Sequence, residues 1–160
     1  MSRAISKGMT PTVLDRLIDP DSGGTAARPG YSLDEIVRGV QRDLEELLNA
    51  RLSRVVIPEQ YRELLVSPIH YGLPDFGSIA TSTTKDHEAI SHRIELAIER
   101  FEPRLRQVNV LLVEDRTAQG SKSLQFQIEA QLKIDPYPDV SFETILELTT
   151  GVTKVKAVRV

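Results

Sequence analysis

The stretch IELAIERFEPRLRQVNVLLV, residues 94–113, contains the change of hydrophobic pattern that decides the fold. Up to Phe101 the apolar residues recur every three or four positions, which is typical of one face of a helix. After Pro103 they recur every second position, which is typical of a strand. Proline fixes its own φ and disfavours helical geometry in the residue before it. We therefore predict that a helix gives way to a strand at Glu102 to Arg104.

Other segments complete the predicted domain. A second long helix is predicted from residue 32 to about residue 51, because Ser32 and Glu35 form an S-x-x-E capping box before an apolar run at helical spacing. A short helix is expected at residues 58–66. Residues 124–134 alternate between apolar and polar side chains, as an antiparallel strand with one solvated face does, and another strand follows Val140. This order indicates an α+β fold, with two long helices packed on one face of a three- to four-stranded antiparallel sheet.

Both ends of the chain are predicted to differ from this domain, which we assign to residues 31–151. Residues 1–30 are expected to form an N-terminal arm and flexible linker with a short amphipathic helix, whose apolar side includes Val13, Leu14 and Leu17. This helix either docks on a partner or folds back on its own domain. Residues 152–160 are expected to form an exposed β-prone tail, which either pairs with a partner strand or is disordered.

The composition of the 160-residue chain argues against several classes of protein. A formal net charge of −3 does not fit a nucleic-acid-binding surface, and no apolar run approaches the ~20 residues that cross a bilayer. The absence of cysteine removes disulfides, thiolate metal sites and a cysteine nucleophile. His87 and His92 are five residues apart, which is not the spacing of a helical metal site. We expect no metal, no cofactor, no nucleic acid and no direct membrane insertion.

Glu102 and Arg104 are the candidate functional residues. Residues two apart in an extended segment point the same way, so an acid and a base would project together beside Pro103. One interpretation is an ion pair in solvent, which contributes ~0–1 kcal/mol. The other is a paired contact for a partner, in which arginine supplies its planar fork. Acid catalysis fits less well, because a neighbouring cation stabilises a charged carboxylate, whereas a general acid must hold its proton.

Several motifs, in their order along the chain, resemble the TssE and gene 25-like family of baseplate wedge proteins. This family includes baseplate subunits of bacterial type VI secretion systems and wedge proteins of contractile-tail phages. The resemblance covers about residues 13–151. The motifs are VLDRLID, VQRDLEELLNAR, YRELLVSPIHYGLPDF, IELAIERFEPRLRQVNV, LQFQIEAQL and VSFETIL. The segment VSPIHYGLPD departs from the usual form, since Pro68 and His70 replace commoner residues.

The resemblance implies a structural role without catalytic residues, in the cytoplasm at the inner face of the cytoplasmic membrane. TssF, TssG and TssK would be the wedge partners, and the subunit would connect the wedge to the TssB/TssC sheath. Glu102, Pro103 and Arg104 match the family's Glu-Pro-Arg signature, which implies a contact with the wedge core bundle. The free tail or the adjacent sheet edge could pair with a sheath strand. The family's lysozyme-like label leaves one alternative, a muralytic enzyme with Glu102 as its acid.

Overall fold

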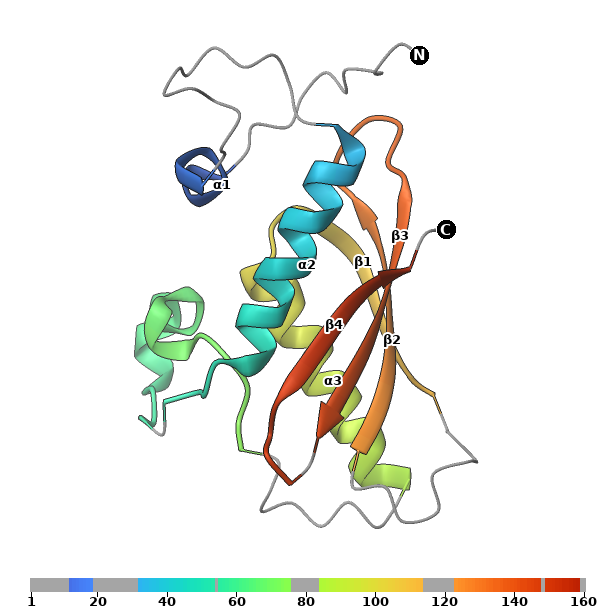
Figure 1. Ribbon diagram of the computed structural model, residues 1–160. Coiled ribbons are helices and arrows are strands. Elements are labelled where there is room, and N and C mark those ends of the chain that lie inside the picture. Colours follow the sequence, from blue (N-terminus) through green and yellow to red (C-terminus); the bar gives the residue numbers. More distant parts are fainter. Residues whose placement is uncertain are drawn as a thin grey trace.

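The computed structural model describes residues 12–18, 32–53, 55–75, 84–113, 123–147 and 149–158 (Figure 1). The predicted linker, from residue 19 to 30, lies outside the described residues. In chain order the elements are α1 (Val13–Ile18), α2 (Leu33–Asn49), η1 (Glu59–Val66), η2 (Pro68–His70), α3 (Thr84–Phe101), β1 (Leu105–Val113), β2 (Ser123–Leu132), β3 (Asp139–Glu147) and β4 (Thr153–Val158). The predicted α+β class is confirmed.

The four strands form one antiparallel sheet in the order β1-β2-β3-β4, as Figure 1 shows. The alternation in β2 places Ile128 and Phe126 in the core, where Ile128 lies opposite Val110 of β1 and Phe142 of β3. Residues at the intervening positions, such as Gln127, lie on the other face of the sheet. One face therefore belongs to the hydrophobic core, and the other is mostly polar.

Helices α2 and α3 bury their apolar stripes in the same core. Helix α2 begins with the predicted capping box, in which the Ser32 N–H donates to Glu35 Oε2 at 2.7 Å and the Glu35 N–H donates to the Ser32 hydroxyl at 3.3 Å. Helix α2 contacts β4, and α3 contacts β1. The buried apolar residues of the two helices are Ile36, Val40, Leu44, Leu47, Leu48, Ile90, Ile94, Ala97 and Ile98.

Helical structure is not confined to these two long helices. The short helix expected at residues 58–66 is present as η1, but it is a 3₁₀ helix with a non-helical backbone at Tyr61 (φ −108°, ψ 54°). It ends before Pro68, and Ser67 has the extended geometry (φ −90°, ψ 164°) that a following proline favours. The prolines that flank η1 therefore keep it short.

The C-terminal segment belongs to the sheet, so the prediction of an exposed tail is wrong for Thr153–Val158. These residues form β4, in which Val155 lies opposite Thr144 of β3. Thr153 and Val155 are 3% and 5% exposed, whereas the intervening Lys154 is exposed. The alternation that suggested a strand for a partner instead completes the chain's own sheet.

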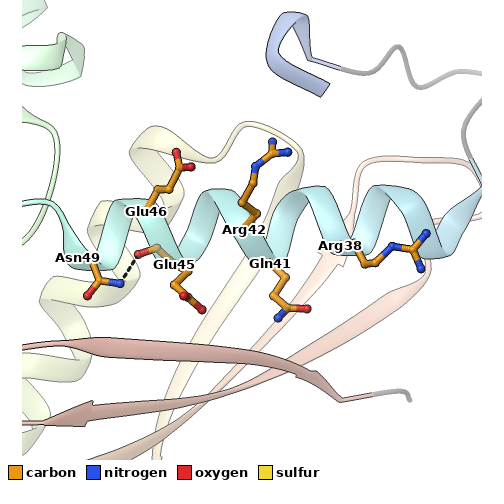
Figure 2. Close-up of a pocket in the computed structure, with 6 residues that line it drawn as sticks. All are labelled: Arg38, Gln41, Arg42, Glu45, Glu46 and Asn49. Atoms are coloured by element: carbon orange, nitrogen blue, oxygen red, sulfur yellow. Dashed lines mark hydrogen bonds between the residues drawn. The ribbon is translucent and has the colours of Figure 1, made fainter. Parts of the chain in front are cut away.

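Three polar side chains of α2 bind the outer edge of β4. Gln41 Nε2 donates to the Val155 carbonyl oxygen at 2.9 Å, and the Val155 N–H donates to Glu45 Oε2 at 3.1 Å. Asn49 Nδ2 donates to the Thr153 carbonyl oxygen, and the Thr153 N–H donates to Asn49 Oδ1, both at 2.8 Å. Figure 2 shows Gln41 and Glu45 pointing from α2 toward the strands. Edge strands expose backbone groups that invite pairing, and here α2 occupies them.

Candidate functional site

The turn between α3 and β1 contains the candidate residues Glu102, Pro103 and Arg104. Helix α3 ends before this turn, as predicted, because the Glu102 N–H donates to the Ile98 carbonyl oxygen at 2.8 Å and Pro103 has no N–H to continue the pattern. The Leu105 N–H donates to the Glu102 carbonyl oxygen at 3.2 Å, with proline at the second position of the resulting β-turn. The segment is therefore a turn, not the extended segment that the prediction assumed.

Glu102 and Arg104 form an internal ion pair within this turn. Glu102 Oε1 accepts hydrogen bonds from Arg104 Nε at 2.7 Å and from the Arg104 backbone N–H at 3.0 Å, and Oε2 accepts one from Nη2 at 2.5 Å. The predicted pairing is confirmed, but Glu102 is only 4% exposed, so the pair is not a surface pair in solvent. The carboxylate fixes Arg104 and offers a partner almost no surface of its own.

Arg104 connects the turn to α2 and approaches α1. Its Nη2 also donates to Asp43 Oδ2 at 2.5 Å, and Asp43 Oδ1 accepts from Arg42 Nε at 3.0 Å and Nη2 at 2.7 Å. Arg42 Nη2 donates to Asp15 Oδ1 at 2.7 Å, and Arg104 Nη1 lies 3.9 Å from Asp15 Oδ2. We call Asp15, Arg42, Asp43, Glu102 and Arg104 the ion-pair cluster. It ties together three segments that are distant in the sequence.

Burial and ion pairing act in opposite directions on the pKa values of the cluster. Burial lowers the pKa of Arg104, but the hydrogen bonds and charges of Glu102 and Asp43 outweigh it and hold that pKa above its ordinary value. Burial raises the pKa of Asp15, but hydrogen bonds from Thr12 and Arg42 outweigh it and hold that pKa below its ordinary value. Arg104 and Asp15 are therefore both charged at neutral pH.

The segment around the YGLPD motif supports the same end of α3. The Tyr71 ring meets the Phe101 ring edge-on, with centroids 5.2 Å apart and planes at 74°. His70 Nδ1 and Arg100 Nη1 are 2.9 Å apart. Burial raises the pKa of Tyr71, and the nearby carboxylates, including Glu102, add to this effect. These contacts hold η2 against the helix that leads into the turn.

The described part of the arm lies close to α2, with its apolar side chains facing outward. The predicted docking residues Val13, Leu14 and Leu17 are 74%, 43% and 78% exposed. Asp15 points instead into the ion-pair cluster, where it meets Arg42. The arm was predicted either to dock on a partner or to fold back on its own domain. The polar side of α1 folds back on the domain, because Asp15 contacts α2. The apolar side remains available for the predicted docking.

The sequence did not single out three residues of the cluster, which are Asp15, Arg42 and Asp43. Only Asp15 carries a local signal, because Thr12 and Asp15 form a T-x-x-D pattern in which the Thr12 N–H donates to Asp15 Oδ2 at 3.1 Å. Arg42 and Asp43 lie among the charged residues of α2, which are typical of a solvated helix face. Arg42 meets a residue 27 positions away, and Asp43 meets one 61 positions away. No local pattern reports contacts of this kind.

The geometry gives little support to acid catalysis by Glu102. Glycoside hydrolysis needs two carboxyl groups that flank an accessible cleft, whereas the Glu102 side chain is 5% exposed and bonded through both oxygens to Arg104. Among the described residues, no three His, Asp or Glu side chains are grouped to hold a metal ion. No helix in the described part of the chain is long and apolar enough to cross a membrane.

A comparison of the sequence with protein families identifies the family of this chain. The family model of the baseplate wedge protein gp25 matches residues 34–137, which is more than half of the chain. The chain belongs to the baseplate wedge family. The matched region of this wedge protein includes Asp43 and the Glu102–Arg104 turn, whereas Asp15 and β4 lie outside it. No curated protein and no solved structure matches the chain.

Proposed function

We propose that this wedge protein is a structural, non-enzymatic subunit of a type VI secretion baseplate, which links the wedge to the contractile sheath. Its proposed location is the cytoplasm, at the inner face of the cytoplasmic membrane. The observation that carries the proposal is the ion-pair cluster, which fixes the Glu102–Arg104 turn to α2. A turn held in one orientation by charged hydrogen bonds suits a subunit that positions its neighbours. The family match supports the baseplate role.

The proposed wedge contact, with TssF, TssG and TssK, uses the exposed parts of this turn. Pro103 is exposed, and Arg104 keeps 14% of its side chain exposed. The buried Glu102 would contribute indirectly, because it orients the planar Arg104 guanidinium that a partner would contact. Val13, Leu14 and Leu17 on α1 would add an apolar contact, since clustered exposed apolar side chains mark interaction sites.

The proposed contact with the TssB/TssC sheath uses the sheet. An added strand needs backbone groups that no other group occupies, and β1 and β4 are the two edge strands. Side chains of α2 already bind the backbone of Thr153 and Val155 in β4. The hypothesis of strand pairing through residues 152–160 therefore moves to the outer edge of β1.

Co-purification with TssF and TssG tests the wedge contact. Arg104→Ala removes the guanidinium, and we expect a loss of bound partner of about tenfold or more, the effect typical of a central interface residue. Arg106→Ala, just beyond the turn but outside the ion-pair cluster, is the matched control and should bind as the wild type does. Urea unfolding of both variants shows that they are folded. Wild-type binding by Arg104→Ala would remove the turn from the interface.

A peptidoglycan zymogram tests the non-enzymatic part of the proposal. The purified chain should clear no peptidoglycan, because the only carboxylate proposed as an acid is buried beneath Arg104. Clearing by the wild type that disappears in Glu102→Gln would contradict the structural role and restore the muralytic alternative.

A further inference from the structure

Helix α1 places a carboxylate on a site that is built from α2 and the α3–β1 turn. We call Gly39, Arg42 and Arg104 the arginine site. Asp15 Oδ1 accepts a hydrogen bond from Arg42 Nη2 at 2.7 Å, and Asp15 Oδ2 lies 3.9 Å from Arg104 Nη1. A Cβ atom on Gly39 would lie 3.5 Å from Asp15 Oδ1 and 3.6 Å from Arg104 Nη1. Gly39 therefore lies directly next to the Asp15 carboxylate and the Arg104 guanidinium, within van der Waals reach of both.

Asp15 does not use the whole hydrogen-bonding capacity of the arginine site. Arg104 Nε and Nη2 donate to Glu102 and Asp43. Within the described part of the chain, Arg104 Nη1 has only the 3.9 Å approach to Asp15, which is too long for a hydrogen bond. Guanidiniums bind carboxylates most strongly when each oxygen receives a well-aligned N–H. A carboxylate that moved closer to Nη1 would engage both arginines.

The contact of α1 with this site is mostly polar. The helix has six residues, and its apolar side chains remain exposed, from 43% for Leu14 to 78% for Leu17. Such a short helix is not stable by itself in water, and most helices in proteins are stabilised by packing of an apolar face. Because α1 packs little apolar surface, a competing carboxylate can replace it without exposing a buried core.

We propose that the arginine site binds an acidic side chain on a helix of a wedge partner, and that α1 occupies the site in the free subunit until this partner displaces it. The inference rests on the proposed wedge function. The chemistry of the partner follows from the occupant in the structure, since Asp15 shows that a helix carrying a carboxylate fits over Gly39 between Arg42 and Arg104. Helix α1 is therefore an internal competitor of the partner.

Affinity for a purified TssF–TssG complex gives the first test. Asp15→Asn weakens the competitor while keeping its size, so binding should tighten about fivefold, because less of the subunit is held in the closed form. Arg42→Gln removes a donor from the site and should weaken binding about tenfold. Arg93→Gln, an exposed arginine on α3, is the control and should change nothing. Unchanged or weaker binding by Asp15→Asn would overturn the displacement.

The position of α1 gives the second test. The chain has no cysteine, so Leu17→Cys and Glu99→Cys introduce the only two sites for spin labels, and both positions are exposed. The free 160-residue chain should give one narrow distribution of label distances. Addition of TssF–TssG should shift it to longer values, because α1 leaves the arginine site, and Asp15→Asn should broaden it even without the partner. An unchanged distribution in the complex would overturn the proposal.

The outcomes separate this inference from the proposed function. If the wild-type chain fails to bind TssF–TssG, the wedge function itself fails. If it binds while α1 keeps its position, only the displacement fails. If Asp15→Asn instead self-associates with increasing concentration, the site takes α1 of a second copy, and the assignment to a wedge partner is wrong.

Discussion

The buried Glu102 carboxylate holds the Arg104 guanidinium in place, and this role determines the effect of substituting Glu102. The side chain is 5% exposed, and its two oxygens accept three hydrogen bonds from Arg104. Removal of one member of a buried ion pair leaves the other charge without its partner, which costs more than the pair contributes. The effect of Glu102 on any partner should therefore pass through the geometry of Arg104.

Glu102→Ala should lower the free energy of unfolding by about 3 kcal/mol, because it leaves the Arg104 guanidinium without its main counter-charge. Urea unfolding followed by circular dichroism measures the loss. Glu99→Ala, which replaces an exposed glutamate near the end of α3, is the control and should stay within about 0.5 kcal/mol of the wild type. Equal stability of the two variants would show that the ion-pair cluster adds no net stability.

For single residues, the sequence predicts which nearby side chains pair better than it predicts where those side chains point. Proline geometry correctly predicted that Glu102 and Arg104 pair, because their separation of two residues is local. It did not predict the β-turn that directs the carboxylate inward, which depends on the hydrogen bond between the Leu105 N–H and the Glu102 carbonyl oxygen. Asp43 could not be predicted, since folding alone brings it to Arg104.

Helix α2 uses two of its sides for different tasks. Gln41, Glu45 and Asn49 recur every four residues, so they lie above one another along the helix and meet the edge of β4. Arg42 belongs to the ion-pair cluster, and Figure 2 shows it pointing away from Gln41 and Glu45. These polar residues of α2 therefore bind specific groups elsewhere in the fold, although their pattern in the sequence is typical of a solvated helix face.

Asn49→Ala should expose the edge of β4. It leaves the N–H and carbonyl oxygen of Thr153 without their side-chain partner, which should cost about 1–3 kcal/mol of stability. Hydrogen exchange of the Thr153 amide should accelerate clearly. Arg38→Ala, an exposed residue of the same helix, is the control and should leave this exchange rate unchanged. Equal protection in both variants would mean that Asn49 does not secure the edge.

The elements with a strong local period were predictable, and those defined by their partners were not. The capping box at Ser32 and the alternation in β2 follow from short-range physics, and both are present. The alternation of residues 152–158 correctly indicated a strand, but a single-strand pattern does not say which strand it will join. Its own β3 was the nearest available edge, and β4 pairs with it.

Across the whole molecule, the helices leave the sheet unequal edges. Side chains of α2 occupy the outer edge of β4 at two residues, whereas among the described residues no side chain binds the outer edge of β1 in this way. The sheet order that creates this difference could not be read from the sequence, because it depends on which strands become the edges. The α+β class and the family could be read, because each rests on the order of motifs along the chain.

Cross-linking to assembled sheath tests which edge is used. Leu111 on β1 and Lys156 on β4 are both exposed. The chain has no cysteine, so a single cysteine introduced at either position gives one labelling site. A photo-reactive label at Leu111→Cys should capture TssB or TssC, and the same label at Lys156→Cys should not, because α2 occupies the β4 edge. The opposite result would return the sheath contact to β4.

The hydrogen bonds between α2 and β4 also have a consequence for the order in which the protein is made. They join residues 104, 110 and 114 positions apart. At about 5–20 residues per second, α2 leaves the ribosome roughly 5 to 20 seconds before its strand has been synthesised. During that interval Gln41, Glu45 and Asn49 of α2 lack the backbone groups of β4 that they bind in the folded protein, so this side of α2 is open to chaperones or to wrong contacts. Completion of the sheet, and of its contacts with α2, therefore comes late in the formation of this fold.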